Sequence, residues 1–147
     1  MLNIRLLSVA TIAVVLMGCS DGTGGGQLVP GRWYTPSQVQ QGKLVFQANC
    51  ASCHGNEAQG TMLDWRKTLA DGSYPPPPLN GTAHAWHHPM SVLLRTIREG
   101  GIRLGGKMPG FGQSLSEEQQ LAAIAFFQSH WTEDIYKEWM SRGGPQR

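Results

Sequence analysis

The chain has 147 residues, of which 40% are hydrophobic and 15% charged, and its formal net charge at pH 7 is +2. This length suits one globular domain behind a short leader. The near-neutral balance of charges gives no electrostatic basis for binding nucleic acid.

The N-terminus has the pattern of a secretory signal peptide. Arg5 precedes an apolar run over residues 6–17, which ends at the small residue Gly18. The run is shorter than the roughly 20 residues that a membrane-spanning helix needs. Leu16 to Cys19 resembles the lipobox of bacterial lipoproteins, which implies cleavage after Gly18 and lipid on Cys19. A plain signal peptide that leaves Cys19 as a free thiol is the alternative.

Three parts of the chain follow from this pattern. Residues 1–18 are predicted to be a lipoprotein signal peptide, residues 19–32 a flexible glycine-rich tether, and residues 33–147 one folded domain. One acyl chain holds a protein on a membrane only marginally, whereas several hold it firmly. Because bacterial lipoproteins usually carry two or three chains, the mature protein is expected on the periplasmic side of a bacterial membrane.

The first helix is predicted from Thr35-Pro36 up to Cys50, with a capping hydroxyl followed by proline at the first helical position. Gly42, Phe46 and Cys50 recur at a spacing of four and therefore share one face. A glycine inside a helix costs about 1 kcal/mol relative to alanine. Close approach of another helix would justify Gly42, and an incidental surface glycine is the alternative.

Cys50-Ala51-Ser52-Cys53-His54 is a C-x-x-C-H run, the pattern of c-type haem attachment. Cys50 and Cys53 would bond the two vinyl groups of one haem, and His54 would ligate the iron from the proximal side. A redox dithiol needs a βαβ context, and a structural zinc site needs a second close pair of ligands. The sequence shows neither, and its single motif predicts one haem.

A long segment of low periodicity, residues 55–85, follows the motif. A loop of this length inside a compact domain needs a reason. Here a flat cofactor would supply the apolar surface that the large side chains of the segment could cover. Examples are Leu63, Trp65, Leu69 and Leu79, with Trp86 directly after the segment.

Three further helices are predicted. One follows Pro89 and ends at Gly100-Gly101. Another follows Ser116, which forms a capping box with Gln119, and a short final helix follows Thr132. No segment alternates as a strand, so the fold is expected to be all-α.

The pattern from Thr35 to Trp131 resembles the class I (cytochrome c-like) family. Gly42-x-x-x-Phe46-x-x-x-Cys50 is similar to its first helix, and the segment from Pro77 to Gly81 is similar to its P-x-L-x-G segment. Met108-Pro109-Gly110-Phe111 is similar to its distal-ligand loop. The resemblance implies three to five helices wrapped around one covalently bound haem, with the last family helix packed on the first.

The resemblance also implies that the Pro77 carbonyl accepts the second ring N–H of His54. A stiff polyproline spacer is the other interpretation of the four prolines at 75–78. The segment 61–74 is longer than in minimal members of the family. The extension from Trp131 to Trp139 also goes beyond the minimal final helix.

Met108 is the predicted second axial ligand, because its glycine-rich loop is free to bring sulfur to iron and Pro109 restricts its backbone. A core-filling methionine is the alternative. His84, His87 and His88 are the rivals, and one of them would give a bis-His haem of lower potential. They could instead bind copper or zinc, or pack and hydrogen-bond a haem propionate. Further propionate candidates are Trp65, Trp86, Arg98 and Arg103.

These residues predict a membrane-anchored electron carrier with His/Met ligation rather than an enzyme. Its expected partners are redox proteins, an oxidase or a dehydrogenase. The alternative is a haem peroxidase or gas-binding sensor, which needs Met108 absent from the iron or easily displaced. A third hypothesis is a docking subunit for copper delivery or oxidase assembly, with the histidine cluster as the metal site.

Overall fold

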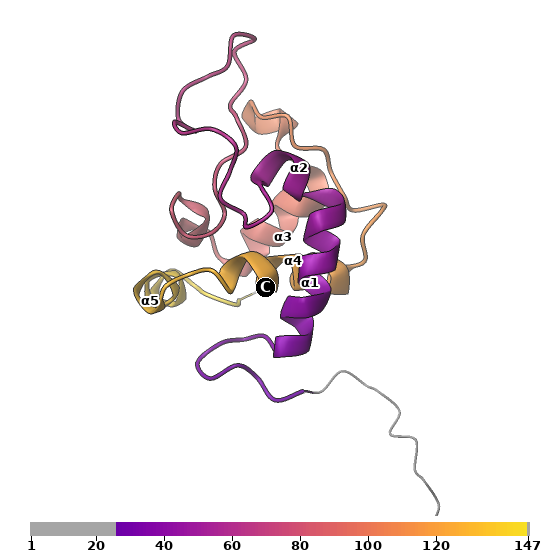
Figure 1. The fold of residues 1–147 in the computed structure, drawn as a ribbon, viewed down its shortest axis with the longest axis vertical. Helices are drawn as coiled ribbons and strands as arrows, with labels where there is room; N and C mark the ends of the chain where they lie inside the picture. The colour runs from indigo at the N-terminus through magenta and orange to yellow at the C-terminus, as the bar shows by residue number, and fades with distance from the viewer. Residues whose placement is uncertain (1–25, 147) are drawn as a thin grey trace, which may run out of the picture.

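The computed structural model describes residues 26–146, and within that range it is all-helical, with no β-strand. This confirms the predicted fold class. The predicted signal peptide, Cys19 and the first part of the predicted tether lie outside the described residues. The elements in chain order (Figure 1) are α1 (Pro36–Asn49), α2 (Ala51–His54), the 3₁₀ turn η1 (Ala85–His87), α3 (Met90–Glu99), the 3₁₀ turn η2 (Ile102–Leu104), α4 (Glu117–Gln128) and α5 (Glu133–Ser141).

The four longer helices begin where local sequence chemistry predicts. The hydroxyls of Thr35 and Ser116 accept from the backbone N–H of the third residue of α1 and α4, and a glutamine side chain closes a capping box at each helix. Thr132 caps α5 by accepting from the N–H of Ile135. Helix α3 ends at Gly100, whose φ of 83° favours glycine. The single turn α2 and the two 3₁₀ turns were not predicted.

Helices α1 and α4 cross in direct backbone contact at Gly42. A Cβ atom placed on Gly42 would lie 1.8 Å from the carbonyl oxygen of Ala122. One turn further along α1, the rings of Phe46 and Phe126 pack with their centroids 5.1 Å apart. The close approach predicted for Gly42 is therefore confirmed, and it fixes the helix that leads into the C-x-x-C-H motif.

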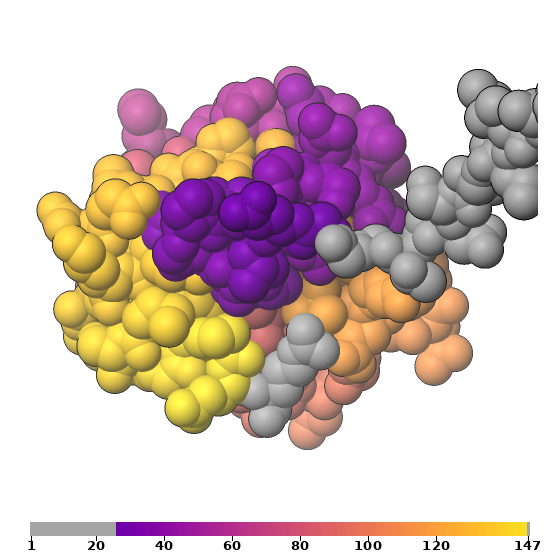
Figure 2. Space-filling view, turned by 90° about the horizontal axis from the view of Figure 1, so that it is seen from below, coloured from indigo at the N-terminus to yellow at the C-terminus, as the bar shows by residue number. Residues whose placement is uncertain are grey.

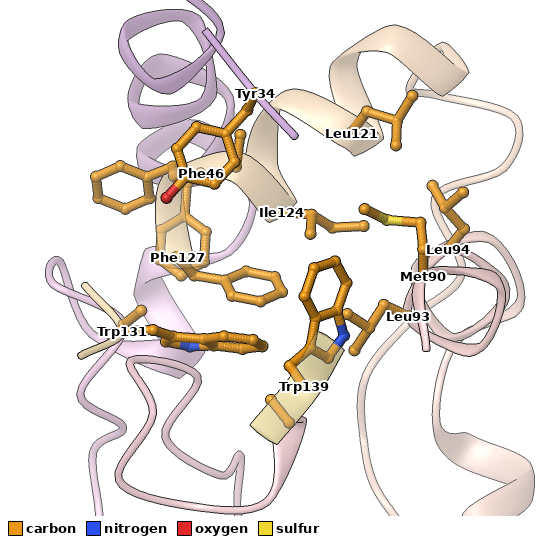
Figure 3. Packing of buried hydrophobic residues seen from close by; sticks show 14 of the residues in the cluster. Tyr34, Phe46, Met90, Leu93, Leu94, Leu121, Ile124, Phe127, Trp131 and Trp139 are labelled. Carbon is orange, nitrogen blue, oxygen red and sulfur yellow. The ribbon is translucent and has the colours of Figure 1, made fainter. Parts of the chain in front are cut away.

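The hydrophobic core lies between α4 and the helices on its other sides. Figure 3 shows Ile124 of α4 facing Met90 of α3 and Trp139 of α5, with Phe127 beside them. Ile124, Met90 and Trp139 are fully buried. Residues 120–128 of α4 are all buried, because the helix has neighbours on every side. Met90, which opens α3, is therefore a core residue.

The C-terminal extension fixes two loops of the domain. The indole N–H of Trp131 donates to the carbonyl of Leu79 over 2.7 Å. The indole N–H of Trp139, on α5, donates to the carbonyl of His88 over 2.9 Å. Each bond joins residues more than 50 positions apart in the chain, so the extension anchors loops that have little periodic structure of their own.

The last residues of the predicted tether are packed rather than free. Val29 packs against the core, and its N–H donates to the Tyr34 carbonyl over 2.9 Å. Arg32 forms an ion pair with Glu133 and lies over the ring of Tyr136, 3.9 Å from its centroid. Figure 2 shows this N-terminal segment lying across the C-terminal part of the molecule. Within the described residues, Val29 is already packed on the domain, ahead of the boundary predicted at residue 33.

Candidate haem site

The C-x-x-C-H motif is built at the junction of α1 and α2. Cys50 is both the last cap of α1 and the first of α2, and its N–H donates to the Phe46 carbonyl over 2.8 Å. The N–H of His54 then donates to the Cys50 carbonyl over 2.9 Å. Because α1 is held by the crossing at Gly42, this single turn carries the imidazole to a fixed place.

His54 is oriented by the hydrogen bond that the resemblance implied. Its Nδ1–H donates to the Pro77 carbonyl, with 2.9 Å between nitrogen and oxygen, which confirms the predicted acceptor. The side chain is buried, with 7% of its surface exposed. Burial lowers the pKa of His54, and the bond to Pro77 opposes that shift. The ring is therefore held neutral, the form in which an imidazole ligates a metal, with its other nitrogen available.

The proline segment is itself tied to the motif. The N–H groups of Leu79 and Asn80 both donate to the carbonyl of Ala58, over 2.7 and 3.1 Å. The Leu79 carbonyl accepts the indole N–H of Trp131. These bonds leave Pro77 little freedom to move away from His54, so the segment does more than space two elements.

Neither of the two motif cysteines forms a disulfide within the described part of the chain. Burial, and then the neighbouring Cys53, raise the pKa of the Cys50 thiol to about 11. Redox dithiols instead depend on a cysteine whose pKa is depressed. The geometry of Cys50 therefore argues against a thioredoxin-like role.

A cavity of about 570 Å³ adjoins the motif, a volume typical of cofactor sites. Cys50, Cys53, His54 and Met108, all predicted to bind the haem, line this same cavity. Most of the remaining wall is apolar or aromatic, and it comes from the motif helix, the proline segment, α3 and the Met108 loop. The wall includes Phe46, Tyr74, Leu79, Leu93, Ile97, Phe111 and Phe127.

Met108 reaches the cavity on a loop pressed against the end of α3. The N–H of Gly101 donates to the Met108 carbonyl over 2.9 Å. A Cβ on Gly100 would lie 2.6 Å from that carbonyl oxygen, and a Cβ on Gly110 would lie 2.8 Å from the Arg98 carbonyl oxygen. The glycines thus permit the close approach that fixes the loop. The other described methionines do not line the cavity: Met90 is in the core, and Met62 and Met140 are exposed.

The histidine cluster divides into two kinds of residue. His84 and His88 line the cavity, whereas His87 is exposed and does not. The ring of His84 stacks on that of Trp65, with centroids 4.8 Å apart. Among the described residues, no three His, Cys, Asp or Glu side chains are grouped so as to hold a metal ion. The copper or zinc site considered for the three histidines is not formed.

The prediction for the long loop is correct in part. Trp65 and Leu79 line the cavity, but Leu63, Leu69 and Trp86 do not. Leu63 is fully exposed, and Trp86 packs against the ring of His87. An irregular loop has no periodicity from which the direction of each side chain could be deduced. Sequence reasoning missed Tyr74, which also lines the cavity. Only its position directly before the four prolines could have indicated this.

The site fits a haem on two counts. It brings two thiols, a neutral imidazole and a thioether to one cavity, and sulfur and imidazole are the donors that haem c proteins use. Its wall is predominantly apolar, as a flat porphyrin requires.

A helical domain in which the first helix delivers C-x-x-C-H to such a cavity defines a class I c-type cytochrome. The comparison with protein families places the chain more narrowly. Residues 37–127 match the family described as "Cytochrome C oxidase, cbb3-type, subunit III". The match covers more than half of the chain, and the chain belongs to this family.

The chain is also similar in sequence to three curated proteins. The chain is 56% identical over 36 residues to "Cbb3-type cytochrome c oxidase subunit FixP" of Rhizobium meliloti, which covers 24% of the chain and 12% of that protein. It is 35% identical over 82 residues to FixP of Azorhizobium caulinodans, and this alignment covers 56% of the chain and 23% of that protein. It is 32% identical over 123 residues to "Thiosulfate dehydrogenase" of Stutzerimonas stutzeri, and this alignment covers 76% of the chain and 36% of that protein.

The chain spans about an eighth to a third of the length of these relatives. No solved structure matches the chain significantly. Over residues 26–146, no helix has both the length and the apolar character needed to cross a membrane.

Proposed function

We propose that this chain is a monohaem electron carrier, in which Cys50 and Cys53 bind one haem c covalently and His54 and Met108 ligate its iron. The observation that supports this most strongly is the meeting of these four side chains at one apolar cavity, with His54 already oriented by Pro77. The haem supplies one-electron chemistry between ferrous and ferric iron.

The protein side chains limit the chemistry to electron transfer. His54 and Met108 would fill both axial positions, which leaves no place for a substrate on the iron. Both are held by hydrogen bonds to the backbone around them, at Pro77 and at Gly101. A ligand set fixed in this way moves little when the charge of the iron changes. Met/His ligation also raises the potential relative to bis-His ligation, which suits delivery of electrons to an oxidase.

Two kinds of redox partner follow from the relatives. FixP is named as a subunit of a cbb3-type cytochrome c oxidase, so a terminal oxidase is the partner that we propose for this chain. A second relative is named as a thiosulfate dehydrogenase, which raises the question of an enzyme. We propose a carrier rather than an enzyme, because Met108 lines the cavity and as a ligand would occupy the iron position that a substrate needs.

Spectroscopy of the holo-protein tests this function. The ferric protein is expected to show the weak far-red absorption band that marks sulfur ligation, and the ferrous protein to bind no carbon monoxide. Thiosulfate added to the ferric protein alone should leave it ferric. Carbon monoxide binding without the far-red band would instead support an open-site sensor or peroxidase, and direct reduction by thiosulfate would support an enzyme.

Removal of the lipid site should release the domain from the membrane. The proposed anchor is lipid on Cys19, as the lipobox-like Leu16 to Cys19 implies. Cys19→Ser is expected to move most of the protein to the soluble periplasmic fraction without loss of haem, whereas the control Thr23→Ser stays in the membrane fraction. Fractionation with a haem stain measures both. If Cys19→Ser still sediments with membranes after a salt wash, the anchor lies elsewhere.

A further inference from the structure

Residues 71–77, at the end of the long loop, connect the mounts of the two proposed axial ligands. The N–H of Tyr74 donates to the Gly105 carbonyl over 3.0 Å, in the loop that carries Met108. Three positions further on, the Pro77 carbonyl accepts the ring N–H of the proximal histidine. The two ligand mounts are therefore joined through one short segment, which we call the strut.

The strut has little freedom to bend or stretch between these two contacts. Prolines occupy positions 75–78 and fix the backbone φ there at about −65°. The N–H of Leu79, directly after the prolines, donates to the Ala58 carbonyl over 2.7 Å and anchors this end. Because the segment is stiff and anchored, its contacts with His54 and with the Met108 loop keep a fixed separation.

An ion pair joins the start of the strut to the residue beside Met108. The carboxylate of Asp71 pairs through one oxygen with the ammonium group of Lys107. Its other oxygen accepts from the hydroxyl and the N–H of Ser73, over 2.6 and 3.1 Å, so the carboxylate is already oriented. Both charged side chains are about half exposed. The pair is therefore weakened by salt, and its strength is modest.

The Met108 loop is thus held by two separate elements. The end of α3 holds it through the N–H of Gly101, which donates to the Met108 carbonyl. The strut holds it just ahead of the methionine, at Gly105 and Lys107. A Cβ on Gly105 would lie 3.6 Å from the ring of Tyr74, so this ring lies against the turn. Since a methionine side chain is itself flexible, its sulfur keeps one position only if the backbone is held.

We propose that the strut clamps the Met108 loop at a fixed place relative to His54, with Asp71 as a positioning residue that opposes displacement of the thioether from the iron. This proposal rests on the haem c function above. The sulfur has to leave the iron before another ligand can bind there. The apparent affinity for that ligand is reduced in proportion to the fraction of protein in the open form. Loosening the clamp increases this fraction, so the affinity for an added ligand measures the hold on Met108.

Two substitutions of opposite charge test the ion pair. Asp71→Asn removes the negative charge and keeps an oxygen for Ser73, whereas Lys107→Gln removes the positive charge. Each is expected to raise the affinity of the ferric holo-protein for imidazole about two- to fivefold, in line with the strength of an exposed ion pair. Imidazole is used at mildly alkaline pH, where it is uncharged. A mere change of charge near the iron would shift the two affinities in opposite directions, whereas a loosened clamp shifts them in the same direction.

Further comparisons isolate the contact between Asp71 and Lys107. The double variant should show no more than the larger single effect, because the second substitution has no pair left to break. Added salt should raise the affinity of the wild type towards that of Asp71→Asn and change the variant little. Asp64→Asn is the matched control: it removes the same charge from an exposed aspartate of the same loop, whose carboxylate accepts the N–H of Arg66 instead. The control should bind imidazole as the wild type does.

Imidazole titrations of the ferric holo-proteins, followed by loss of the far-red band, give the result. Equal affinities in Asp71→Asn and the wild type, or shifts of opposite sign in Asp71→Asn and Lys107→Gln, would overturn the clamp alone, since the band would still be present. An equal rise in the control Asp64→Asn would overturn it as well. If Asp71→Asn fails to retain haem, the affinity of Lys107→Gln decides. Absence of the band from the wild type would instead overturn Met108 ligation, and the clamp with it.

Discussion

Met108→Ala is expected to leave the haem attached and to turn a carrier into a ligand-binding haem protein. Attachment depends on Cys50 and Cys53, so the pigment should remain. Loss of the thioether would open one axial position to water, cyanide or carbon monoxide. The reduction potential should fall, since methionine favours the ferrous state. Ferric spectra, carbon monoxide titration and midpoint potentials measure these three effects.

The control for this variant is Met62→Ala, which removes an exposed methionine outside the cavity. It should keep the far-red band and the wild-type potential. Of the three clustered histidines, only His84 and His88 line the cavity, so a low-spin bis-His spectrum in Met108→Ala would identify one of these two as a replacement ligand. If Met108→Ala and the wild type have the same spectrum and potential, Met108 is not the ligand.

Among the substitutions considered, Gly42→Leu is expected to lower the free energy of unfolding the most. Leucine is the better helix former, so an isolated surface position would gain about 1 kcal/mol from the change. At Gly42, however, even a Cβ atom would collide with the backbone of Ala122, and the two helices would have to separate. Overpacking of this kind costs about 1–3 kcal/mol or more. Thermal and denaturant unfolding of the holo-protein measures the difference.

Gln41→Leu is the matched control, because Gln41 is the exposed neighbour of Gly42 on the same helix. Its midpoint of unfolding should stay close to that of the wild type. An unchanged or raised midpoint of unfolding in Gly42→Leu would show that α1 and α4 can separate without loss of stability. The helix crossing would then not fix the position of the haem motif.

Features governed by local chemistry were predictable from the sequence. The caps at Thr35, Ser116 and Thr132 depend on a side chain and a backbone N–H only three residues apart, so their residue types are sufficient. Gly42 was informative because glycine inside a helix needs a reason. The motif at Cys50 was informative because its chemistry requires that spacing.

Features that depend on distant parts of the chain were not predictable. The partner of the Trp131 indole is a carbonyl 52 residues away, and no local pattern encodes it. In the long loop, composition suggested that large side chains cover the cofactor, but it could not distinguish Trp65, on the cavity wall, from Leu63, in solvent. The glycine content before Trp33 predicted a free tether, yet the last residues of that segment are held by α5.

If Cys19 carries the proposed lipid, the packing of residues 29–32 against the domain would also limit how far the haem travels from the membrane. Val29 lies ten positions after Cys19, and a chain spans at most about 3.3–3.6 Å per residue, so a lipid on Cys19 would allow a leash of at most roughly 35 Å. From this end, α1 runs to the haem motif on the opposite side of the domain (Figure 1). Its 14 residues add about 21 Å. With lipid on Cys19, the leash and the helix together would keep the haem motif within roughly 55 Å of the lipid surface.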